Sequence, residues 1–414
     1  MTINIEKIIS SLDLTKRCKV KIVSPRENEE HDENTLIKTA LNNPIKSKSF
    51  CEFIKPCKRI LIVVNDATRA TPTRKVMKHI MPLMKNKDIT VIVATGAHRE
   101  PTENEYRTIL GEFYRELRDK TTFNDARDMS TMKFYGVTSR GTKVYVNNII
   151  ERNDCIIVIG STEPHYFAGF TGGRKGIVPG IAGYETIEHN HSFAILPEAK
   201  ILKLKRNPVH EDLVEATLLA TRNIPTFAIN TVLDKNHNLY ACTAGDLIES
   251  HLASVKFAKE VFTVNVKEKA DIVIAVTNPP LDINLYQAQK SLENVRLIIR
   301  QGGIIILVAR CQDGIGPRNF YDLLVSGRSP QEIFEKIEKE YKLGYHKAAK
   351  LITLQKVSTI YAVTKIDTKT LERIGVQKFQ SLEDALNVAI RKLKEYPCNI
   401  LFVRDAAMLV PIPQ

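Results

Sequence analysis

The sequence predicts an α/β protein of two domains, with mostly parallel sheets flanked by helices. Three observations support this. The length of 414 residues suits two or three domains at roughly 100–200 residues each. Short runs of β-branched residues recur, and several are apolar throughout, as in parallel strands covered on both faces. Stretches with helical periodicity separate these runs. We expect the active site in the cleft between the domains, because ligands of such folds bind beyond the carboxyl ends of the strands.

The expected strands come in chain order at 59–65, 89–94, 155–160, 226–232, 271–276, 303–308, 357–363 and 399–403. A capping box that begins at Ser329, with proline at the next position, predicts a helix to Tyr341. Further helices are expected from Asp246 to about 261 and from Ser381 to Tyr396. A polar stretch at 262–270 separates one helix from the next strand. It places the boundary between an N-terminal cofactor-binding catalytic domain at 1–267 and a C-terminal α/β domain at 268–414 that contributes substrate-binding residues.

Composition excludes some classes of protein. Hydrophobic residues make up 43% and charged residues 26%, which indicates a globular chain and not a disordered one. No apolar run reaches the roughly 18–20 residues of a membrane span, and 1–16 has no signal-peptide core. Sixty Lys and Arg against 47 Asp and Glu give a net charge of +13, which suits nucleic acid, an anionic surface or small acidic ligands. The basic residues are dispersed, except for a cluster at 200–206, and Trp is absent. A solvated Lys-rich surface is therefore favoured over a nucleic-acid groove.

The cysteines indicate a reducing compartment. Their number is odd and no C-x-x-C pair occurs, so neither a disulfide framework nor a zinc ribbon is expected. We expect buried, reduced thiols and a cytoplasmic location. The seven cysteines are Cys18, Cys51, Cys57, Cys155, Cys242, Cys311 and Cys398.

Two candidate ligand loops follow the first two strands. The loop Asp66-Ala67-Thr68-Arg69 lies between a strand and a helix start, where backbone N–H groups and Arg69 suit a phosphate. An ordinary loop with a surface arginine is the alternative. His98 and Arg99 follow the next strand on a tight turn, where a histidine can meet a ligand. A structural or solvated histidine is the alternative there.

The richest segment is the glycine-rich stretch 163–183 with the histidines that follow it. It is not a P-loop, because Arg174 precedes Lys175 and Gly176 follows it, so the hydroxyl that would hold magnesium is missing. Lys175 could attach a cofactor covalently. His165 and His191 lie on either side of it in sequence, and neutral imidazole is a good ligand for nickel, zinc or copper.

Two further features qualify these candidates. His189 and His191 would share a face on a strand but not on a helix, so a helix there leaves one of them as the ligand. In the second domain Tyr286 and Lys290 are four residues apart and Gln287 is adjacent. These three side chains suit a carboxylate with a neighbouring hydroxyl, although Gln and Lys commonly just coat a helix.

Taken together, these segments resemble the nickel-pincer-nucleotide-dependent lactate racemase family, over roughly residues 40–320. The motifs that carry the resemblance are D-x-T-R at 66–69, T-G-x-H-R at 95–99, H-x-F-A-G-F-x-G-G-R-K at 165–175, N-H at 190–191 and Y-Q-A-x-K at 286–290.

The resemblance implies a role for each matching residue. Lys175 would carry the cofactor, a Ni(II)-pyridinium-3,5-bisthiocarboxylate mononucleotide, through a thioamide link, and His191 would bind the nickel. His98 and His165 would be the acid–base pair. Asp66, Ala67, Thr68 and Arg69 would bind the nucleotide, and Tyr286, Gln287 and Lys290 the substrate. Arg69, Arg99, Arg174, Lys175 and Lys290 would supply positive charge for a phosphate and a carboxylate.

The implied activity is interconversion of D- and L-lactate, or of a closely related 2-hydroxy acid, by transient hydride transfer to the cofactor. Each enantiomer places its hydroxyl differently, which explains two histidines. The expected partners are the small substrate and cofactor-maturation enzymes, with no nucleic acid and no membrane. The alternatives are a racemase or epimerase of another 2-hydroxy acid with the same cofactor, a Schiff-base enzyme that uses Lys175 with pyridoxal phosphate, and a basic nucleic-acid-binding protein.

Overall fold

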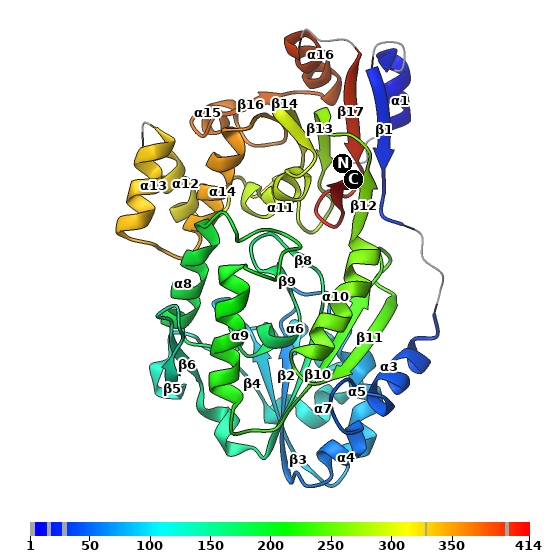
Figure 1. Cartoon of the computed structure of the whole chain (residues 1–414), viewed down its shortest axis with the longest axis vertical. Helices are drawn as coiled ribbons and strands as arrows, with labels where there is room; N and C mark the ends of the chain where they lie inside the picture. The colour runs from blue at the N-terminus through cyan, green and yellow to red at the C-terminus, as the bar shows by residue number, and fades with distance from the viewer. Residues whose placement is uncertain (1–4, 15–17, 27–30, 328, 394–396) are drawn as a thin grey trace. The chain divides into compact units, whose positions relative to one another are not determined.

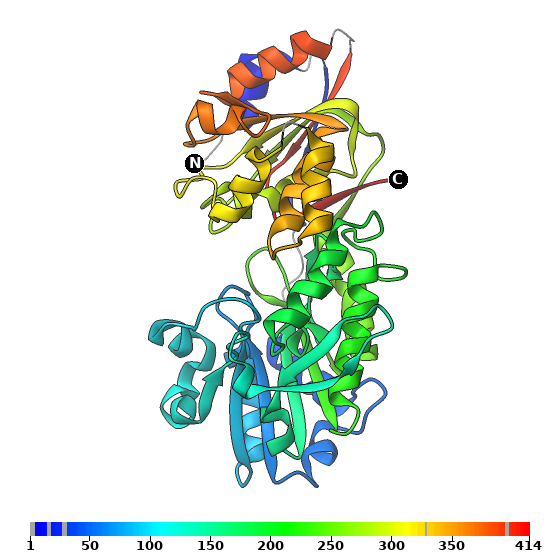
Figure 2. The same cartoon turned by 90° about the vertical axis from the view of Figure 1, so that its left-hand side faces the viewer.

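The computed structural model describes residues 5–14, 18–26, 31–327, 329–393 and 397–414. The chain divides into two compact units (Figures 1 and 2). The middle unit is Glu27–Val261, and the terminal unit combines Met1–Arg26 with Phe262–Gln414. The mixed α/β architecture with mostly parallel sheets confirms the predicted fold class. Across the described ranges, no helix combines the length and apolar character that crossing a membrane requires.

The middle unit is built on a six-stranded sheet in the order β11-β10-β7-β2-β3-β4. Every neighbouring pair is parallel except β10 and β11. The carboxyl ends of β2, β3, β7 and β10 therefore share one edge of the sheet. The strands are β2 (Arg59–Asn65), β3 (Asp88–Ala94), β4 (Thr121–Phe123), β7 (Cys155–Ser161), β10 (Thr226–Leu233) and β11 (Leu239–Gly245).

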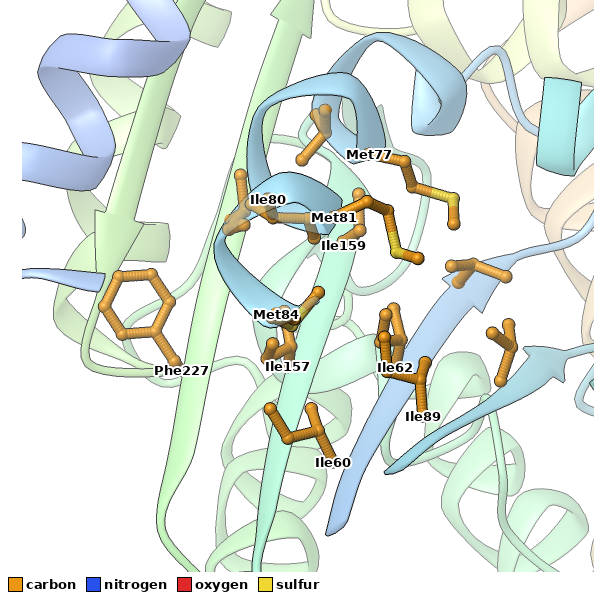
Figure 3. Close-up of a cluster of buried hydrophobic side chains, with 14 of the residues drawn as sticks. Ile60, Ile62, Met77, Ile80, Met81, Met84, Ile89, Ile157, Ile159 and Phe227 are labelled. Atoms are coloured by element: carbon orange, nitrogen blue, oxygen red, sulfur yellow. The ribbon is translucent and has the colours of Figure 1, made fainter. Parts of the chain in front are cut away.

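The core of this unit forms because its strands have no solvated face. All seven residues of β7 are buried. Alternate residues such as Ile60, Ile62 and Ile157 pack beneath Met77 and Ile80 on one face (Figure 3). Each such side chain contributes about 1.5–3 kcal/mol when fully buried. The helices are α3 (Glu33–Asn42), α4 (Phe50–Ile54), α5 (Thr73–Ile80), α6 (Glu103–Leu110), α7 (Tyr114–Leu117), α8 (Tyr184–Ser192), α9 (Pro208–Thr221) and α10 (Glu249–Phe262).

Two short antiparallel ladders complete the middle unit. β5 (Met132–Val137) pairs with β6 (Lys143–Asn147), and β8 (Pro164–His165) pairs with β9 (Gly169–Phe170). The second pair lies inside the glycine-rich segment, so that segment begins as a tight hairpin.

The terminal unit has a second six-stranded sheet, which is parallel throughout, in the order β1-β17-β13-β14-β15-β16. Its strands are β1 (Cys18–Val23), β13 (Ala270–Val276), β14 (Ile299–Val308), β15 (Ser358–Val363), β16 (Val376–Phe379) and β17 (Cys398–Val403). Its helices are α1 (Ile5–Ser11), α11 (Leu285–Val295), α12 (Arg318–Val325), α13 (Pro330–Lys339), α14 (Tyr345–Gln355), α15 (Thr368–Glu372) and α16 (Leu382–Leu393). Separately, β12 (Thr263–Val266) pairs with β18 (Val410–Pro413).

All eight expected strands are present, and the three expected helices occur as α10, α13 and α16. Ser329 caps α13 by accepting a hydrogen bond from the N–H of Glu332. The expected end of the last helix at Tyr396 lies outside the described residues. The N-terminal domain is expected at 1–267, whereas the structure groups Met1–Arg26 with the terminal unit. The cause is β1, which pairs along β17.

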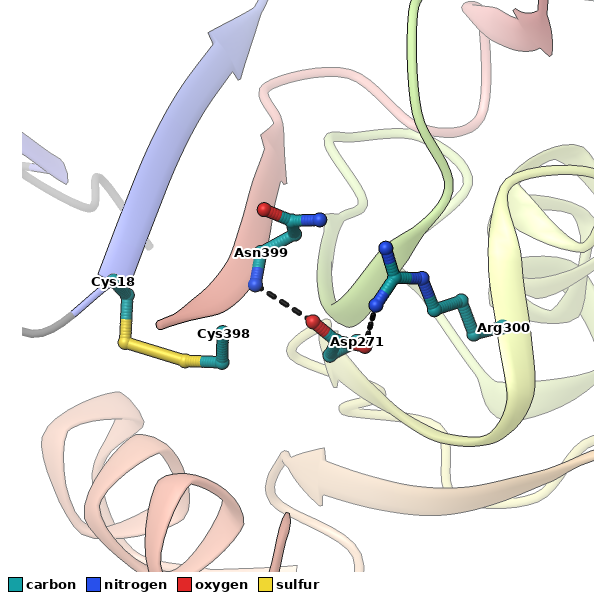
Figure 4. The surroundings of a disulfide bond; sticks show 5 residues. All are labelled: Cys18, Asp271, Arg300, Cys398 and Asn399. Carbon is teal, nitrogen blue, oxygen red and sulfur yellow. Dashed lines mark hydrogen bonds and ion pairs between the residues drawn. A yellow bond between two sulfur atoms is a disulfide. The ribbon is translucent and has the colours of Figure 1, made fainter. Parts of the chain in front are cut away.

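The expectation that all thiols are reduced is wrong for one pair. Cys18 and Cys398 are directly opposed in the β1–β17 register and form a disulfide, with Cα atoms 4.7 Å apart (Figure 4). Beside it, Asp271 accepts hydrogen bonds from the Asn399 N–H and from Arg300. The other five cysteines are free. The disulfide therefore joins β1 to β17 across 380 residues of sequence.

Candidate active site

The first candidate loop follows β2 and is tied to the neighbouring strand β7. Asn65 donates from Nδ2 to Thr71 Oγ1 at 2.7 Å, and Thr71 donates to Ser161 Oγ at 2.9 Å. Asn65 and Ser161 are the last residues of β2 and β7. The loop Asp66–Arg69 is thus anchored over the carboxyl edge of the sheet, as the sequence predicted.

Asp66 and His98 form a close pair. His98 Nδ1 lies 2.6 Å from Asp66 Oδ2, and the Asp66 side chain is 9% exposed. The other carboxylate oxygen accepts from the N–H and hydroxyl of Thr68. Burial opposes ionisation, but the hydrogen bond and charge of His98, with Thr68 and Arg69, hold the pKa of Asp66 below its usual value. An ionised Asp66 accepts a hydrogen bond from a protonated Nδ1 of His98. Nε2 of His98 is then available for proton exchange.

The turn that carries His98 rests on the loop that follows Lys175. Gly96 donates its N–H to the carbonyl of Gly180 at 2.9 Å. A side chain on Gly180 would bring its Cβ within 2.8 Å of Ala94, so only glycine permits this approach. The β3 turn and the glycine-rich segment therefore share one packed junction.

Glycine is also required just before Lys175. Gly172 has φ +84°, and a Cβ there would lie 2.5 Å from Thr162 Oγ1. Gly173 donates its N–H to Asn230 Oδ1 at 2.8 Å. Asn230 lies on β10. The chain then forms a 3₁₀ turn over Gly173–Gly176 that presents Lys175.

Arg174 does not serve as a ligand cation, contrary to the expectation. Its side chain is fully buried. It donates to the carbonyls of Ala168, Phe170 and Gly172, and it lies 2.9 Å from His251 Nε2 on α10. Its donors are directed at the backbone of its own loop, so its role is to hold the segment that ends in Lys175.

Arg99 likewise has a partner within the protein. Its guanidinium makes two 2.8 Å hydrogen bonds to the Glu105 carboxylate at the start of α6. Four cations of the middle unit were expected to bind ligands. Two of them, Arg174 and Arg99, are bonded to backbone carbonyls and to a carboxylate, so Arg69 and Lys175 remain as the candidates.

The ring of Phe167 brings the remaining candidates together. Its centroid lies 4.5 Å from that of His165 and 5.0 Å from that of His191, and Lys175 Nζ lies 5.9 Å from it. His191 is on α8, and the helix separates it from His189, as the spacing predicted. His189 instead has its Nδ1 2.8 Å from Thr142 Oγ1.

The electrostatics favour uncharged forms of two of these groups. Burial, followed by the charge of Lys175, lowers the pKa of His191 to about 3. Burial, followed by the charges of Arg69 and Arg174, lowers the pKa of Lys175 well below its ordinary value. A neutral imidazole is the form that binds a metal, and a neutral amine is the nucleophilic form. Among the described residues, no group of three or more His, Cys, Asp or Glu side chains is arranged to hold a metal ion.

The three candidates for substrate binding lie on α11 of the terminal unit. Asn284 caps this helix by accepting from the N–H of Gln287. Gln287 is exposed and Lys290 is half-buried. The ring of Tyr286 packs edge-on against Phe320 of α12, with centroids 5.3 Å apart.

Comparison with known proteins identifies the family. Models of the lactate racemase N-terminal and C-terminal domains match residues 6–201 and 265–410. The lactate racemase of Thermoanaerobacterium thermosaccharolyticum is 34% identical over 312 residues, which cover 74% of this chain and 72% of that protein. The chain belongs to the lactate racemase family. As a member of it, the protein is an isomerase of the racemase type.

Other relatives agree with this assignment. The lactate racemase of Lactiplantibacillus plantarum is 33% identical over 310 residues, which cover 73% of this chain and 72% of that protein. The structure of the lactate racemase apoprotein from T. thermosaccharolyticum matches with a TM-score of 0.87 and 30% identity over 94% of both chains. A Thermotoga maritima protein matches with a TM-score of 0.71 at 15% identity, over 94% of this chain and all of that one, which shows the fold alone.

Several residues that shape this site were not recognised from the sequence. Phe167 belongs to the motif at 165–175 but was given no role of its own, although its ring contacts both His165 and His191. Asp66 was expected at the nucleotide and was not paired with His98. His251, which contacts Arg174, is 77 residues further along the chain and carries no local signal. For Asp66 the missing information was that β2 and β3 are neighbours, which would have placed the two loops side by side.

Proposed function

We propose that this racemase interconverts D- and L-lactate, or a closely related 2-hydroxy acid, with a nickel-pincer nucleotide attached at Lys175 and with His98 and His165 as acid and base. The observation that supports it most is the grouping of Lys175, His165 and His191 around Phe167. We propose the cytoplasm as its location because five of the seven cysteines are free, although Cys18 and Cys398 are bonded. We propose cofactor-maturation enzymes as its partners in the cell.

The residues present fit such a cofactor. The low pKa of His191 keeps its imidazole available to nickel, and the low pKa of Lys175 favours the amine that forms a covalent link. Arg69 and the loop after β2 suit the phosphate of a nucleotide, with Asp66, Ala67 and Thr68 beside it. When bound, the nickel-pincer nucleotide would accept a hydride from the substrate carbon and return it.

The two histidines are held in complementary tautomers by their neighbours. His98 Nδ1 faces the Asp66 carboxylate and therefore carries the proton, so its Nε2 can accept one. His165 Nδ1 accepts from the N–H of Ala168 at 3.3 Å, so its Nε2 carries the proton and can donate it. His98 thus removes the hydroxyl proton of one enantiomer, and His165 supplies a proton to the oxygen of the other. The reverse reaction exchanges these roles.

The substrate carboxylate is assigned to Lys290 and Gln287. An ammonium and a primary amide on adjacent turns of α11 can hold a carboxylate by charge and by hydrogen bonds, which lowers the entropic part of the barrier. Tyr286 lies on the same helix and is proposed to bind the substrate with them, while its ring packs against Phe320.

The test is to produce the protein together with the cofactor-building enzymes. Nickel content, intact mass and conversion of D- and L-lactate are then measured. We expect up to one nickel per chain, an adduct on Lys175 and racemisation in both directions. Full activity with an unmodified Lys175 would refute the proposal. A panel of other 2-hydroxy acids in the same assay identifies the substrate.

The histidine roles are tested with His98→Asn and His165→Asn, with His237→Asn as the control. His237 is exposed and outside the site. We expect both site variants to lose racemisation by about 10²–10⁴-fold while they keep the Lys175 adduct. Wild-type activity in either one would contradict the two-histidine assignment.

A further inference from the structure

A buried lysine lies beside the proposed substrate-binding helix. Helix α14 packs against α11 within the terminal unit (Figure 1). Lys347 is the third residue of α14 and is 7% exposed. A lysine is almost never buried to this extent unless its ammonium has a partner. Its contacts therefore indicate what it holds.

Both ends of Lys347 contact the first turns of α11. Its Nζ donates to the carbonyl of Tyr286 and lies 3.9 Å from the centroid of the Tyr286 ring. Its own carbonyl accepts from Gln289 Nε2 at 2.7 Å. Gln289 is 2% exposed. The segment between these two points contains Gln287, and Lys290 follows directly after it.

The other sides of Tyr286 are also enclosed. Its N–H donates to the carbonyl of Ile315 at 3.0 Å. A Cβ on Gly316 would lie 2.6 Å from the Tyr286 Cβ, so the loop after β14 leaves no room there. Phe320 covers the ring edge. Together with Lys347, these contacts hold the first turn of α11 in one position.

The charge of Lys347 matters to this arrangement. A buried ammonium is stabilised by an acceptor and by an aromatic face, and Tyr286 supplies both. Burial, followed by the charge of Lys290, lowers the pKa of Lys347 to about 7, while Glu293 raises it. The charge of Lys290 thus acts on Lys347, and the contacts of Lys347 with Tyr286 and Gln289 place it on the turns of α11 that carry Gln287 and Lys290.

We propose that Lys347 is a positioning residue, which fixes the first turn of α11 so that Gln287 and Lys290 meet the substrate carboxylate in one geometry. Its Nζ donates to the carbonyl of Tyr286, so we assign it to holding the helix and not to binding the substrate. This inference rests on the proposed function. It adds a residue that none of the five motifs contains.

The test compares Lys347→Met and Lys347→Arg with Lys356→Met in the cofactor-loaded enzyme. Met keeps the length but removes the cation, whereas Arg keeps a cation and donors. Lys356 caps the other end of α14, is exposed, and lies 5.0 Å from the Phe334 ring centroid. It is therefore a lysine–aromatic contact on the same helix that does not involve α11.

We expect Lys347→Met to raise KM for lactate at least ~10-fold, with kcat within ~3-fold, since a displaced carboxylate anchor weakens binding while the acid–base groups stay in place. Lys347→Arg should recover most of the loss, and Lys356→Met should match the wild type. An unchanged KM in Lys347→Met, or an equal rise in Lys356→Met, would overturn the inference.

Gln289→Leu is a second variant, in case Lys347→Met fails to fold. It removes the hydrogen bond from Gln289 to the Lys347 carbonyl but leaves the buried lysine in place. This variant should raise KM in the same direction, and an unchanged KM would overturn the inference. Wild-type enzyme that carries nickel and the adduct but does not racemise any 2-hydroxy acid would overturn the proposed function, and the inference with it. An active wild type with unaffected variants overturns the inference alone.

Discussion

The imidazole of His98 is hydrogen-bonded to the carboxylate of Asp66, with Nδ1 and Oδ2 2.6 Å apart. The two residues follow different strands, β2 and β3, which are neighbours in the parallel sheet. A carboxylate on Nδ1 fixes the tautomer of a histidine and stabilises its protonated form. The pair therefore makes Asp66 a residue that positions the proposed base, in addition to its expected place at the nucleotide.

The first prediction concerns this pair. Asp66→Asn replaces an acceptor with an amide that can donate, so His98 can take the other tautomer. We expect kcat to fall by about 10²–10⁴-fold, with the Lys175 adduct still present by intact mass. Asp128→Asn is the control, because Asp128 accepts from the N–H and hydroxyl of Ser130 as Asp66 does from Thr68, but it is not paired with a histidine. Equal effects of the two substitutions would contradict the positioning role.

The second prediction separates the metal ligand from the covalent link. In His191→Asn, the proposed nickel ligand is lost while Lys175 is unchanged. We expect the organic adduct to stay on Lys175 and the nickel content to fall below about one tenth of the wild type, since this histidine is the only protein ligand in the proposal. Mass spectrometry and metal analysis of the same sample measure both. His189→Asn, on the same helix but directed at Thr142, should keep its nickel.

The expected strands were predictable because both faces of each sheet are covered, so the strands read as unbroken apolar runs. β1 was missed for the opposite reason. It lies at the edge of its sheet, and between its two buried ends exposed lysines alternate with the half-buried Val20 and Ile22. Its short pattern, close to the chain start, is ambiguous without its partner β17.

The candidate loops were predictable because each one follows a strand, but their contacts were not. Sequence alone does not order the strands in a sheet, so the pairing of Asp66 with His98 was not visible. Arg174 shows the same limit. A basic residue in a glycine-rich loop suits a ligand, yet here the loop folds back and its own carbonyls surround the guanidinium.

The third prediction concerns the glycine before the lysine turn. In Gly172→Ala, the new Cβ would meet Thr162 Oγ1 at 2.5 Å on a backbone with φ +84°. Gly302→Ala is a matched control, because its φ is +77° but nothing lies within 4 Å of the new Cβ. Both changes impose backbone strain of about 1–3 kcal/mol, and only the first adds a clash. We expect Gly172→Ala alone to reduce adduct formation on Lys175, measured by intact mass. Similar adduct levels in both variants would show that the close approach is unimportant.

The fourth prediction concerns the disulfide between Cys18 and Cys398. A cross-link across 380 residues restricts the unfolded chain, and such bonds typically contribute about 2–4 kcal/mol. Cys18→Ser should therefore lower the thermal midpoint of the terminal unit under oxidising conditions. Adding a reductant should bring the wild type down to the variant, and thiol counting should find two more thiols. Cys51→Ser, which removes an exposed free thiol, should change nothing. A wild-type midpoint that does not respond to reductant would argue against a stabilising bond.

The fifth prediction follows from two buried histidines beside Arg174. Burial, followed by the charge of Arg174, lowers the pKa of His210 to about 3 and that of His251 well below its usual value. Between pH ~6.5 and ~3 the unfolded chain therefore binds protons that the folded chain does not, so stability falls as the pH falls. His210 should cost about 2 kcal/mol of unfolding free energy between pH 7 and pH 5, and His251 adds a loss in the same direction.

This loss is measurable by urea unfolding of the middle unit at both pH values, followed by circular dichroism. His210→Gln removes one of the two titrating groups, so the loss of stability between pH 7 and pH 5 should shrink by about 2 kcal/mol. His237→Asn removes an exposed histidine and should leave the pH dependence as it is. If His210→Gln kept the full wild-type slope, proton uptake by this buried cluster could not be the source of the acid sensitivity, because the histidine that should bind the proton would be gone.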